Sequence, residues 1–135
     1  MSALQGTCLC GAVRFEITAP FDRVGVCHCE SCKRISGGYG TVSGRVPTDA
    51  IRILEGEEFL TTYQPGTGTA KTFCSRCGTN LFGGGWPESP LTPVRLPTLD
   101  EPYDGKIQAH LFVQSVAPWE EIPDDGLPRY EGRAP

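Results

Sequence analysis

The chain has 135 residues, a length that fits one domain, and its 17 glycines and 12 prolines exclude a helical bundle or a coiled coil. Its 12 basic and 16 acidic side chains give a formal net charge of −4, which disfavours binding to nucleic acid. No apolar run reaches the roughly 18 residues that span a bilayer, and the N-terminus lacks the basic and apolar regions of a secretory signal. We therefore expect a cytoplasmic protein that binds neither nucleic acid nor a membrane.

Most of the expected elements are short strands separated by turns. In the first strand, Val13, Phe15 and Ile17 alternate with polar residues and predict one buried face. A short helical turn is predicted over 29–35. Further strands are expected around 51–53 and over 58–63, 70–73 and 106–116, with a Pro- and Gly-containing turn at 64–68.

Two segments are predicted to lack regular structure. Residues 83–97 contain three glycines and four prolines, which favours a long loop. The segment 126–135 is expected to be a loosely held tail. Residues 1–135 as a whole are predicted to form a single domain of short strands.

The seven cysteines are the most informative feature of the sequence. An odd number cannot pair completely within one chain, and without an export signal we expect reduced thiols. A redox C-x-x-C motif is expected in a βαβ context, which is absent from this pattern. Tight grouping is typical of metal ligands and favours zinc. The groups are Cys8 and Cys10; Cys27, Cys29 and Cys32; and Cys74 and Cys77.

The first and last groups resemble each other, because a glycine follows each pair. Gly11 and Gly78 permit a positive φ that turns the following amides back toward the sulfurs. Structural zinc takes four ligands, and a C-x-x-C pair usually needs a second pair from elsewhere in the chain. We therefore predict one closed structural site, made of Cys8, Cys10, Cys74 and Cys77.

The middle group, Cys27, Cys29 and Cys32, is left without a fourth partner. Three protein ligands and an open position are typical of catalytic zinc, so two zinc ions per chain are expected. His28 is an alternative fourth ligand, but in an extended segment its side chain points away from its neighbours', which favours a packed or hydrogen-bonded histidine. His110 is a weaker alternative, because it lies far along the chain on an expected strand.

Three motifs carry a resemblance to a known family: Cys-Leu-Cys-Gly-Ala-Val-Arg-Phe at 8–15, Cys-His-Cys-Glu-Ser-Cys-Lys-Arg at 27–34 and Phe-Cys-Ser-Arg-Cys-Gly-Thr-Asn-Leu at 73–81. The chain resembles the glutathione-dependent formaldehyde-activating family, which includes centromere protein V. Segments 98–102, 110–113 and 117–119 extend this resemblance over nearly the whole chain. It implies an all-β fold of small packed antiparallel sheets around a structural zinc, related to that of Rab-binding exchange chaperones. It also implies that the first and last pairs hold the structural zinc and that the middle group holds the zinc associated with activity.

The resemblance implies a carbon–sulfur lyase-type activity that forms or cleaves S-hydroxymethylglutathione from glutathione and formaldehyde. Three thiolates around Zn²⁺ leave a local charge of −1, which suits holding an incoming thiol as thiolate better than activating a carbonyl. Glutathione is anionic, and the available cations are Lys33, Arg34, Arg45, Arg76 and Arg95. The alternatives are a non-catalytic, zinc-stabilised module that binds a protein partner, and a redox or metal-buffer role for a labile zinc.

Overall fold

A computed structural model describes residues 3–135, and within this range the chain is mostly β, with one α-helix, α1 (Glu30–Ser36). The strands are β1 (Leu4–Thr7), β2 (Arg14–Ile17), β3 (Arg23–Cys27), β4 (Thr41–Pro47), β5 (Ile51–Glu55), β6 (Leu60–Tyr63), β7 (Lys71–Cys74), β8 (Asn80–Phe82), β9 (Leu91–Arg95) and β10 (Ala109–Leu111). Short 3₁₀ turns lie at Thr48–Ala50, Glu57–Phe59, Leu96–Thr98 and Val113–Ser115. None of the described helices has the length and apolar character that crossing a membrane requires.

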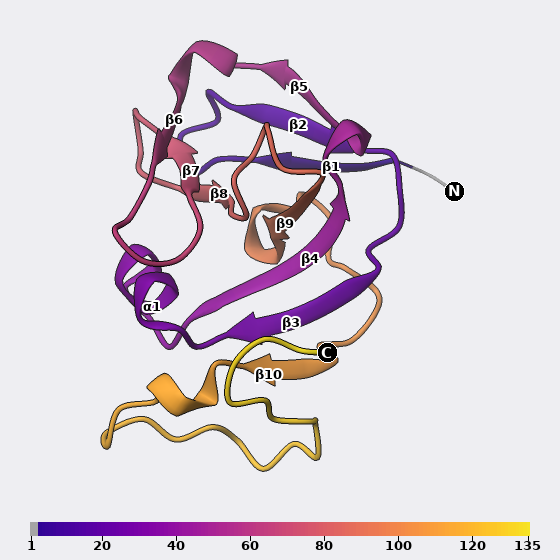
Figure 1. Cartoon of the computed structure of the whole chain (residues 1–135). Helices are drawn as coiled ribbons and strands as arrows, with labels where there is room; N and C mark the ends of the chain where they lie inside the picture. Colours follow the sequence, from indigo (N-terminus) through magenta and orange to yellow (C-terminus); the bar gives the residue numbers. More distant parts are fainter. Residues whose placement is uncertain (1–2) are drawn as a thin grey trace.

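The strands of residues 3–135 form two sheets that pack against each other (Figure 1). The smaller sheet has the order β1-β2-β5, and the larger has the order β10-β3-β4-β9-β8-β7-β6. Neighbouring strands are antiparallel, except that β10 runs parallel to β3 at one edge. The prediction of an all-β fold of packed, largely antiparallel sheets is confirmed.

The hydrophobic core lies between the two sheets. Phe15 on β2 meets Phe82 on β8 edge to face, with ring centroids 5.2 Å apart, and both side chains are fully buried. Val13 and Ile17 are buried beside Phe15, so the predicted alternation of this strand is confirmed. Fully burying one such side chain stabilises a fold by roughly 1.5–3 kcal/mol. These contacts fix how the sheets stack.

The second face of the larger sheet is polar and forms the floor of a cavity. Alternate side chains of a strand point to opposite faces. On β4 and β9, Val46 and Val94 enter the core. The residues between the core positions face the cavity, and on β3, β4 and β9 they include Cys27, Thr41, Ser43 and Arg95.

The long loop predicted over 83–97 is confirmed for 83–90 but is wrong from Leu91 onward, because β9 lies there and a 3₁₀ turn begins at Leu96. Thr92 and Val94 are fully buried, and the alternation of these residues outweighs the prolines. Pro93 cannot donate to a neighbouring strand, but its carbonyl still accepts a hydrogen bond from the Gly83 amide at 3.0 Å.

The strand predicted over 106–116 is confirmed only for Ala109–Leu111. It ends because Phe112 has a φ of 57° and a 3₁₀ turn follows at Val113–Ser115. The strand predicted over 58–63 begins only at Leu60, because Glu57–Phe59 forms a turn. The strands predicted at 51–53 and 70–73 and the helical turn at 29–35 correspond to β5, β7 and α1. Five strands, β1, β3, β4, β8 and β9, were not predicted.

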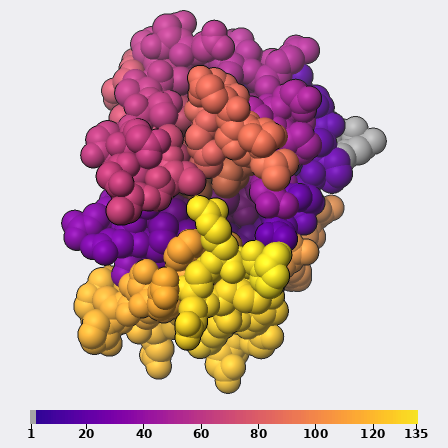
Figure 2. All heavy atoms as spheres, viewed as in Figure 1, coloured from indigo at the N-terminus to yellow at the C-terminus, as the bar shows by residue number. Residues whose placement is uncertain are grey.

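The segment 126–135, expected to be a loose tail, runs beside β10 (yellow in Figure 2). The Tyr130 amide donates to the His110 carbonyl, and the His110 amide donates to the Pro128 carbonyl, both at 2.9 Å. Arg23 Nη2 donates to the Pro135 carbonyl at 2.6 Å. These bonds bring the segment to the edge of the cavity, and its looseness stays a prediction.

Candidate metal centres and the adjoining cavity

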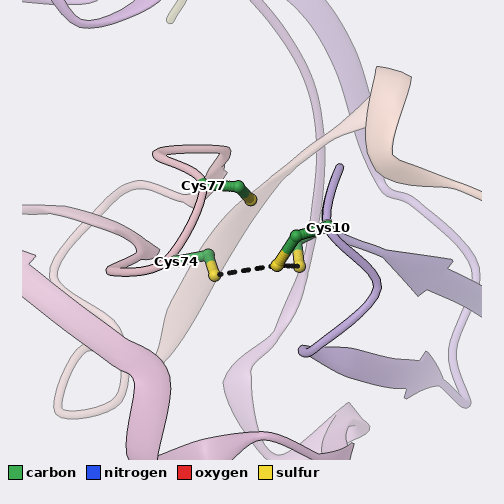
Figure 3. Close-up of side chains that lie close together, drawn as sticks. Cys10, Cys74 and Cys77 are labelled. Atoms are coloured by element: carbon green, nitrogen blue, oxygen red, sulfur yellow. Dashed lines mark hydrogen bonds between the residues drawn. The ribbon is translucent and has the colours of Figure 1, made fainter.

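The first cysteine pair lies in the turn between β1 and β2, whereas in the last pair Cys74 ends β7 and Cys77 lies in the turn that leads to β8. The sulfurs of Cys8, Cys10, Cys74 and Cys77 all lie within 4.8 Å of one another, and Figure 3 shows three of these side chains converging from the two turns. Cys10 Sγ is 3.6 Å from Cys8 Sγ and 3.9 Å from Cys74 Sγ. Four sulfurs bound tetrahedrally at about 2.3 Å from one ion would be about 3.8 Å apart. The predicted set therefore fits a closed metal site.

In each turn the glycine amide donates back to the carbonyl of the pair's first cysteine, across three residues in the first turn and four in the second. The Gly11 amide donates to the Cys8 carbonyl at 3.0 Å, and the Gly78 amide donates to the Cys74 carbonyl at 2.7 Å. Gly11 and Gly78 have φ values of 83° and 82°, and a Cβ on either would have nothing within 4 Å. Both glycines are thus required by backbone conformation and not by space, as the sequence predicted.

Neighbouring groups fix the sulfurs of this closed cluster. The Val13 amide donates to Cys8 Sγ at 3.3 Å, and Thr79 Oγ1 lies 3.2 Å from Cys77 Sγ. Burial raises the pKa of Cys74 to about 11. Burial also acts to raise the pKa of Cys77, but hydrogen bonds from Thr79 outweigh it and lower the value to about 5. One buried, weakly acidic thiol and one strongly acidic thiol therefore face each other.

The middle group forms a second cluster, in which Cys27 ends β3, Cys29 precedes α1 and Cys32 lies in the first turn of α1. Their three sulfurs lie within 4.8 Å of one another, and no fourth Cys, His, Asp or Glu among residues 3–135 joins them. Cys29 Sγ accepts the Cys32 amide at 3.4 Å and lies 3.4 Å from Ser31 Oγ. Hydrogen bonds within the group raise the pKa of Cys27 and lower that of Cys29. The predicted triplet is thus convergent and asymmetric.

His28 has both ring nitrogens engaged away from the triplet. Nδ1 donates to the Tyr39 carbonyl at 3.1 Å, Nε2 lies 2.9 Å from His110 Nδ1, and His110 Nε2 lies 2.8 Å from Asp125 Oδ2. The two rings therefore form one hydrogen-bonded chain that ends on a backbone carbonyl at one side and on a carboxylate at the other. Burial lowers the pKa of His28. This network is hydrogen-bonded, the interpretation that the sequence favoured over a fourth metal ligand.

A cavity of about 620 Å³ adjoins the triplet, and all three of its cysteines line it. This volume is in the range of small-molecule sites. Among the described residues that line it, one is acidic, Glu30, and it pairs with Arg34 at 2.9 Å. Five are basic: Arg23, Arg45, Lys71, Arg95 and Arg133. The cavity therefore suits an anionic ligand.

Two of the five cations predicted to serve an anionic ligand reach this cavity, Arg45 and Arg95. The other three, Lys33, Arg34 and Arg76, contact Glu120, Glu30 and the ring of Phe59 instead. Lys71 was missed by sequence reasoning, as were Arg23 and Arg133. The alternation of polar residues along 23–27 and 41–45 is the signal that could have identified this face.

A family model described as glutathione-dependent formaldehyde-activating enzyme matches residues 3–115. The chain belongs to this family. A Halomonas elongata protein provisionally given that name is 33% identical over 138 residues, which cover 88% of this chain and 80% of that protein. A Talaromyces marneffei protein of the same provisional name is 28% identical over 78 residues, which cover 56% of this chain and 42% of the relative. A crystal structure of a Rhodobacter sphaeroides protein superposes with a TM-score of 0.62 at 27% identity, covering 76% of this chain and 96% of that one.

The family match divides the cavity wall into two parts. It contains all seven cysteines together with Lys71 and Arg95, which line the floor. The segment 116–135 lies outside the match, yet it supplies Asp125 to the His28–His110 chain and Arg133 to the cavity rim. Asp125 and Arg133 therefore lie outside the matched range.

Proposed function

We propose that both cysteine clusters bind zinc and that the chain forms or cleaves the carbon–sulfur bond of S-hydroxymethylglutathione. The family match and the names of the relatives support a reaction of glutathione with formaldehyde. The observation that carries the proposal is the triplet. Three convergent thiols, with no fourth ligand among residues 3–135, open into a cationic cavity of about 620 Å³.

The donor sets of the two clusters suit zinc in different ways. Four thiols around one point fill a tetrahedral site, whereas three leave one position open. A zinc ion held by the triplet would have one free coordination position, and a thiol that binds there would be deprotonated. The cations of the cavity offset the negative charge that accumulates there, and the buried guanidinium of Arg95 lies close enough to the three thiols to interact with their charge.

The reaction needs no oxidant, because its atoms balance by addition. In the forward direction a bond forms between the glutathione sulfur and the formaldehyde carbon, and the thiol proton ends on the former carbonyl oxygen. In the reverse direction that bond breaks and the proton returns to sulfur. Cys27, Cys29 and Cys32 fix where the sulfur lies, and the cavity walls orient the rest of the ligand.

The proposal is tested by exchange NMR on zinc-loaded protein with glutathione and ¹³C-labelled formaldehyde. We expect exchange between formaldehyde hydrate and the thiol adduct to exceed the spontaneous rate, and we expect no acceleration with Cys29→Ser. S-Methylglutathione, which lacks the thiol, is the matched ligand control. An unaccelerated exchange in protein with both clusters loaded would contradict the activity and favour the protein-binding module.

A further inference from the structure

We propose that Lys71 and Arg95 form a carboxylate-binding subsite in the cavity, through which the chain selects thiols that also carry a carboxylate. The inference rests on the proposed function, because the triplet holds the thiol of the same ligand. It adds the residues that recognise the ligand's other end.

Arg95 is a buried cation whose hydrogen-bond partners are all neutral side chains. Its Nη1 donates to Thr41 Oγ1 at 3.2 Å and to Ser43 Oγ at 2.7 Å, and its Nε donates to Asn80 Oδ1 at 2.7 Å. Among the described residues, no carboxylate pairs with the Arg95 side chain. Its third nitrogen, Nη2, donates no hydrogen bond to any of them. Every fully buried side-chain nitrogen or oxygen in that range has a partner, so Nη2 must keep an accessible surface. The space beside it is the cavity that Arg95 lines.

Lys71 is the second buried cation of the cavity. Its side chain is 3% exposed, and its ammonium donates to the Thr69 carbonyl at 2.9 Å. An ammonium has three donors, and within residues 3–135 no acid forms an ion pair with this one. Lysine is almost never fully buried unless it is paired. A bound carboxylate would supply both the missing charge and the missing acceptors.

The strand register brings these two cations to one place. One residue beyond the Thr72–Phe82 pair of β7 and β8, Lys71 stands opposite Gly83. The Arg95 guanidinium lies over the same glycine, where an added Cβ would be 2.7 Å from Nη2. Neighbouring strands are about 4.8 Å apart, so side chains from β7 and β9 can approach each other above Gly83, the residue after β8, which has no side chain of its own.

The subsite and the triplet border the same cavity at two points. Thr41, which accepts from the guanidinium, is the cross-strand partner of Cys27. The loop between β6 and β7 reaches α1 (Figure 1), where a Cβ on Gly68 would be 3.0 Å from Ser31 Oγ, the hydroxyl beside Cys29. A ligand with its sulfur at the triplet and a carboxylate several bonds away fits this arrangement.

The remaining cations of the cavity are weaker candidates for this role. Arg45 is already neutralised by Asp22, with nitrogen–oxygen distances of 3.0 and 2.6 Å. Arg23 and Arg133 are exposed, where solvent and salt screen their charge. Lys71 and Arg95 are therefore the two buried, unpaired charges in the cavity that would bind a carboxylate.

The test compares two thiols of similar size by calorimetric titration of the zinc-loaded protein. They are 3-mercaptopropionate, which carries a carboxylate, and 2-mercaptoethanol, which is neutral. We expect the native chain to bind the acid at least about tenfold more tightly, because a hydrogen bond between charged groups contributes more than one factor of ten. In Lys71→Gln this preference should fall to about twofold or less, with the affinity for the neutral thiol unchanged.

Two further variants separate this role from a general effect of charge or folding. Gly83→Ala keeps every charge but displaces the guanidinium, so it should reduce the same preference. Arg52→Gln removes an equal charge from an exposed position on β5 and should leave the preference intact. Equal affinity of the native chain for the two thiols would overturn the subsite alone. So would an equal loss of affinity for the acidic and the neutral thiol in both Lys71→Gln and Gly83→Ala. Failure of the native chain to bind either thiol would overturn the proposed function as well.

Discussion

The two cysteine clusters use the same ligand type but are assembled in opposite ways. The closed cluster joins two turns that are distant in the chain, with Cys10 and Cys74 separated by 64 positions, and it packs against the core through Cys8 and Cys74. The triplet comes from one six-residue stretch at the end of β3 and the start of α1, and it faces the cavity. A metal that cross-links distant segments contributes to folding, whereas one held by a local stretch closes no long loop. The comparison therefore predicts that the first site serves folding and that the second serves ligand binding.

The largest expected difference comes from removing one sulfur at each cluster. Structural zinc binds small domains with about 10–16 kcal/mol, which is comparable to a domain's whole stability of about 5–15 kcal/mol. Cys74→Ser should therefore leave the chain largely unfolded, as judged by circular dichroism. Cys29→Ser should stay folded and lose one equivalent of metal by elemental analysis. Equal loss of structure in the two variants would contradict the division.

A large loss is also expected where the closed cluster meets the core. Phe15→Ala removes a fully buried ring that packs on Phe82, and such changes cost about 3–5 kcal/mol. Urea unfolding of the zinc-loaded protein measures this cost. Leu9→Ala, at an 87% exposed position within the closed cluster's own turn, is the matched control and should change stability by less than about 0.5 kcal/mol. If Phe15→Ala lowered the free energy of unfolding by less than about 0.5 kcal/mol, the sheets would not pack through this ring.

The glycines of the closed cluster should show a smaller effect. Gly11→Ala and Gly78→Ala force a side chain into the left-handed region, at a cost of about 1–2 kcal/mol each. Gly66→Ala, where an added Cβ also meets nothing within 4 Å but φ is ordinary, should cost less than either. Thermal unfolding distinguishes the three, and a similar loss at Gly66 would remove backbone conformation as the reason for the glycines.

The smallest expected effect is a pH dependence of the stability that Glu120 and Asp125 contribute through their contacts with Lys33 and His110. Lys33 Nζ donates to Glu120 Oε1 at 2.6 Å and holds the pKa of that carboxyl below its ordinary 4.5, while a hydrogen bond from His110 lowers the pKa of Asp125. Carboxyls with a lowered folded-state pKa bind fewer protons when folded, so their contribution is present above pH 4.5 and is lost as the pH falls through the folded value. The urea midpoint should decline on acidification below pH 4.5, and less steeply in Glu120→Gln than in the native chain. Identical slopes would show that this contact does not couple α1 to the C-terminal segment.

The sequence was most predictive where covalent spacing determines the structure. Two cysteines one or two residues apart must lie near each other, and the glycines after Cys10 and Cys77 marked the turns that bring the two pairs together. The alternation of Val13, Phe15 and Ile17 likewise identified a strand with one buried face. These features are local, so a single sequence reveals them.

The cavity could not be predicted, because it depends on contacts between distant strands. Pro93 suggested a loop, yet β9 forms there since Thr92 and Val94 are buried by their neighbours. Lys71 looked like an ordinary polar strand residue, and only the order of β7, β8 and β9 places it in the same cavity wall as Arg95. Asp125 reaches His110 through a segment with no strand pattern of its own. Long-range pairing decides all three positions.

The optical spectrum of cobalt-substituted protein during a glutathione titration tests the division most directly, because thiolate-to-cobalt charge-transfer bands report the number of sulfur ligands. With cobalt in both clusters, the account predicts that glutathione strengthens the bands by one added sulfur at the triplet and leaves those of the closed cluster unchanged. Cys29→Ser should retain only the unresponsive spectrum of Cys8, Cys10, Cys74 and Cys77. A native spectrum that does not respond to glutathione, or a response that persists in Cys29→Ser, would contradict an open triplet beside a closed site.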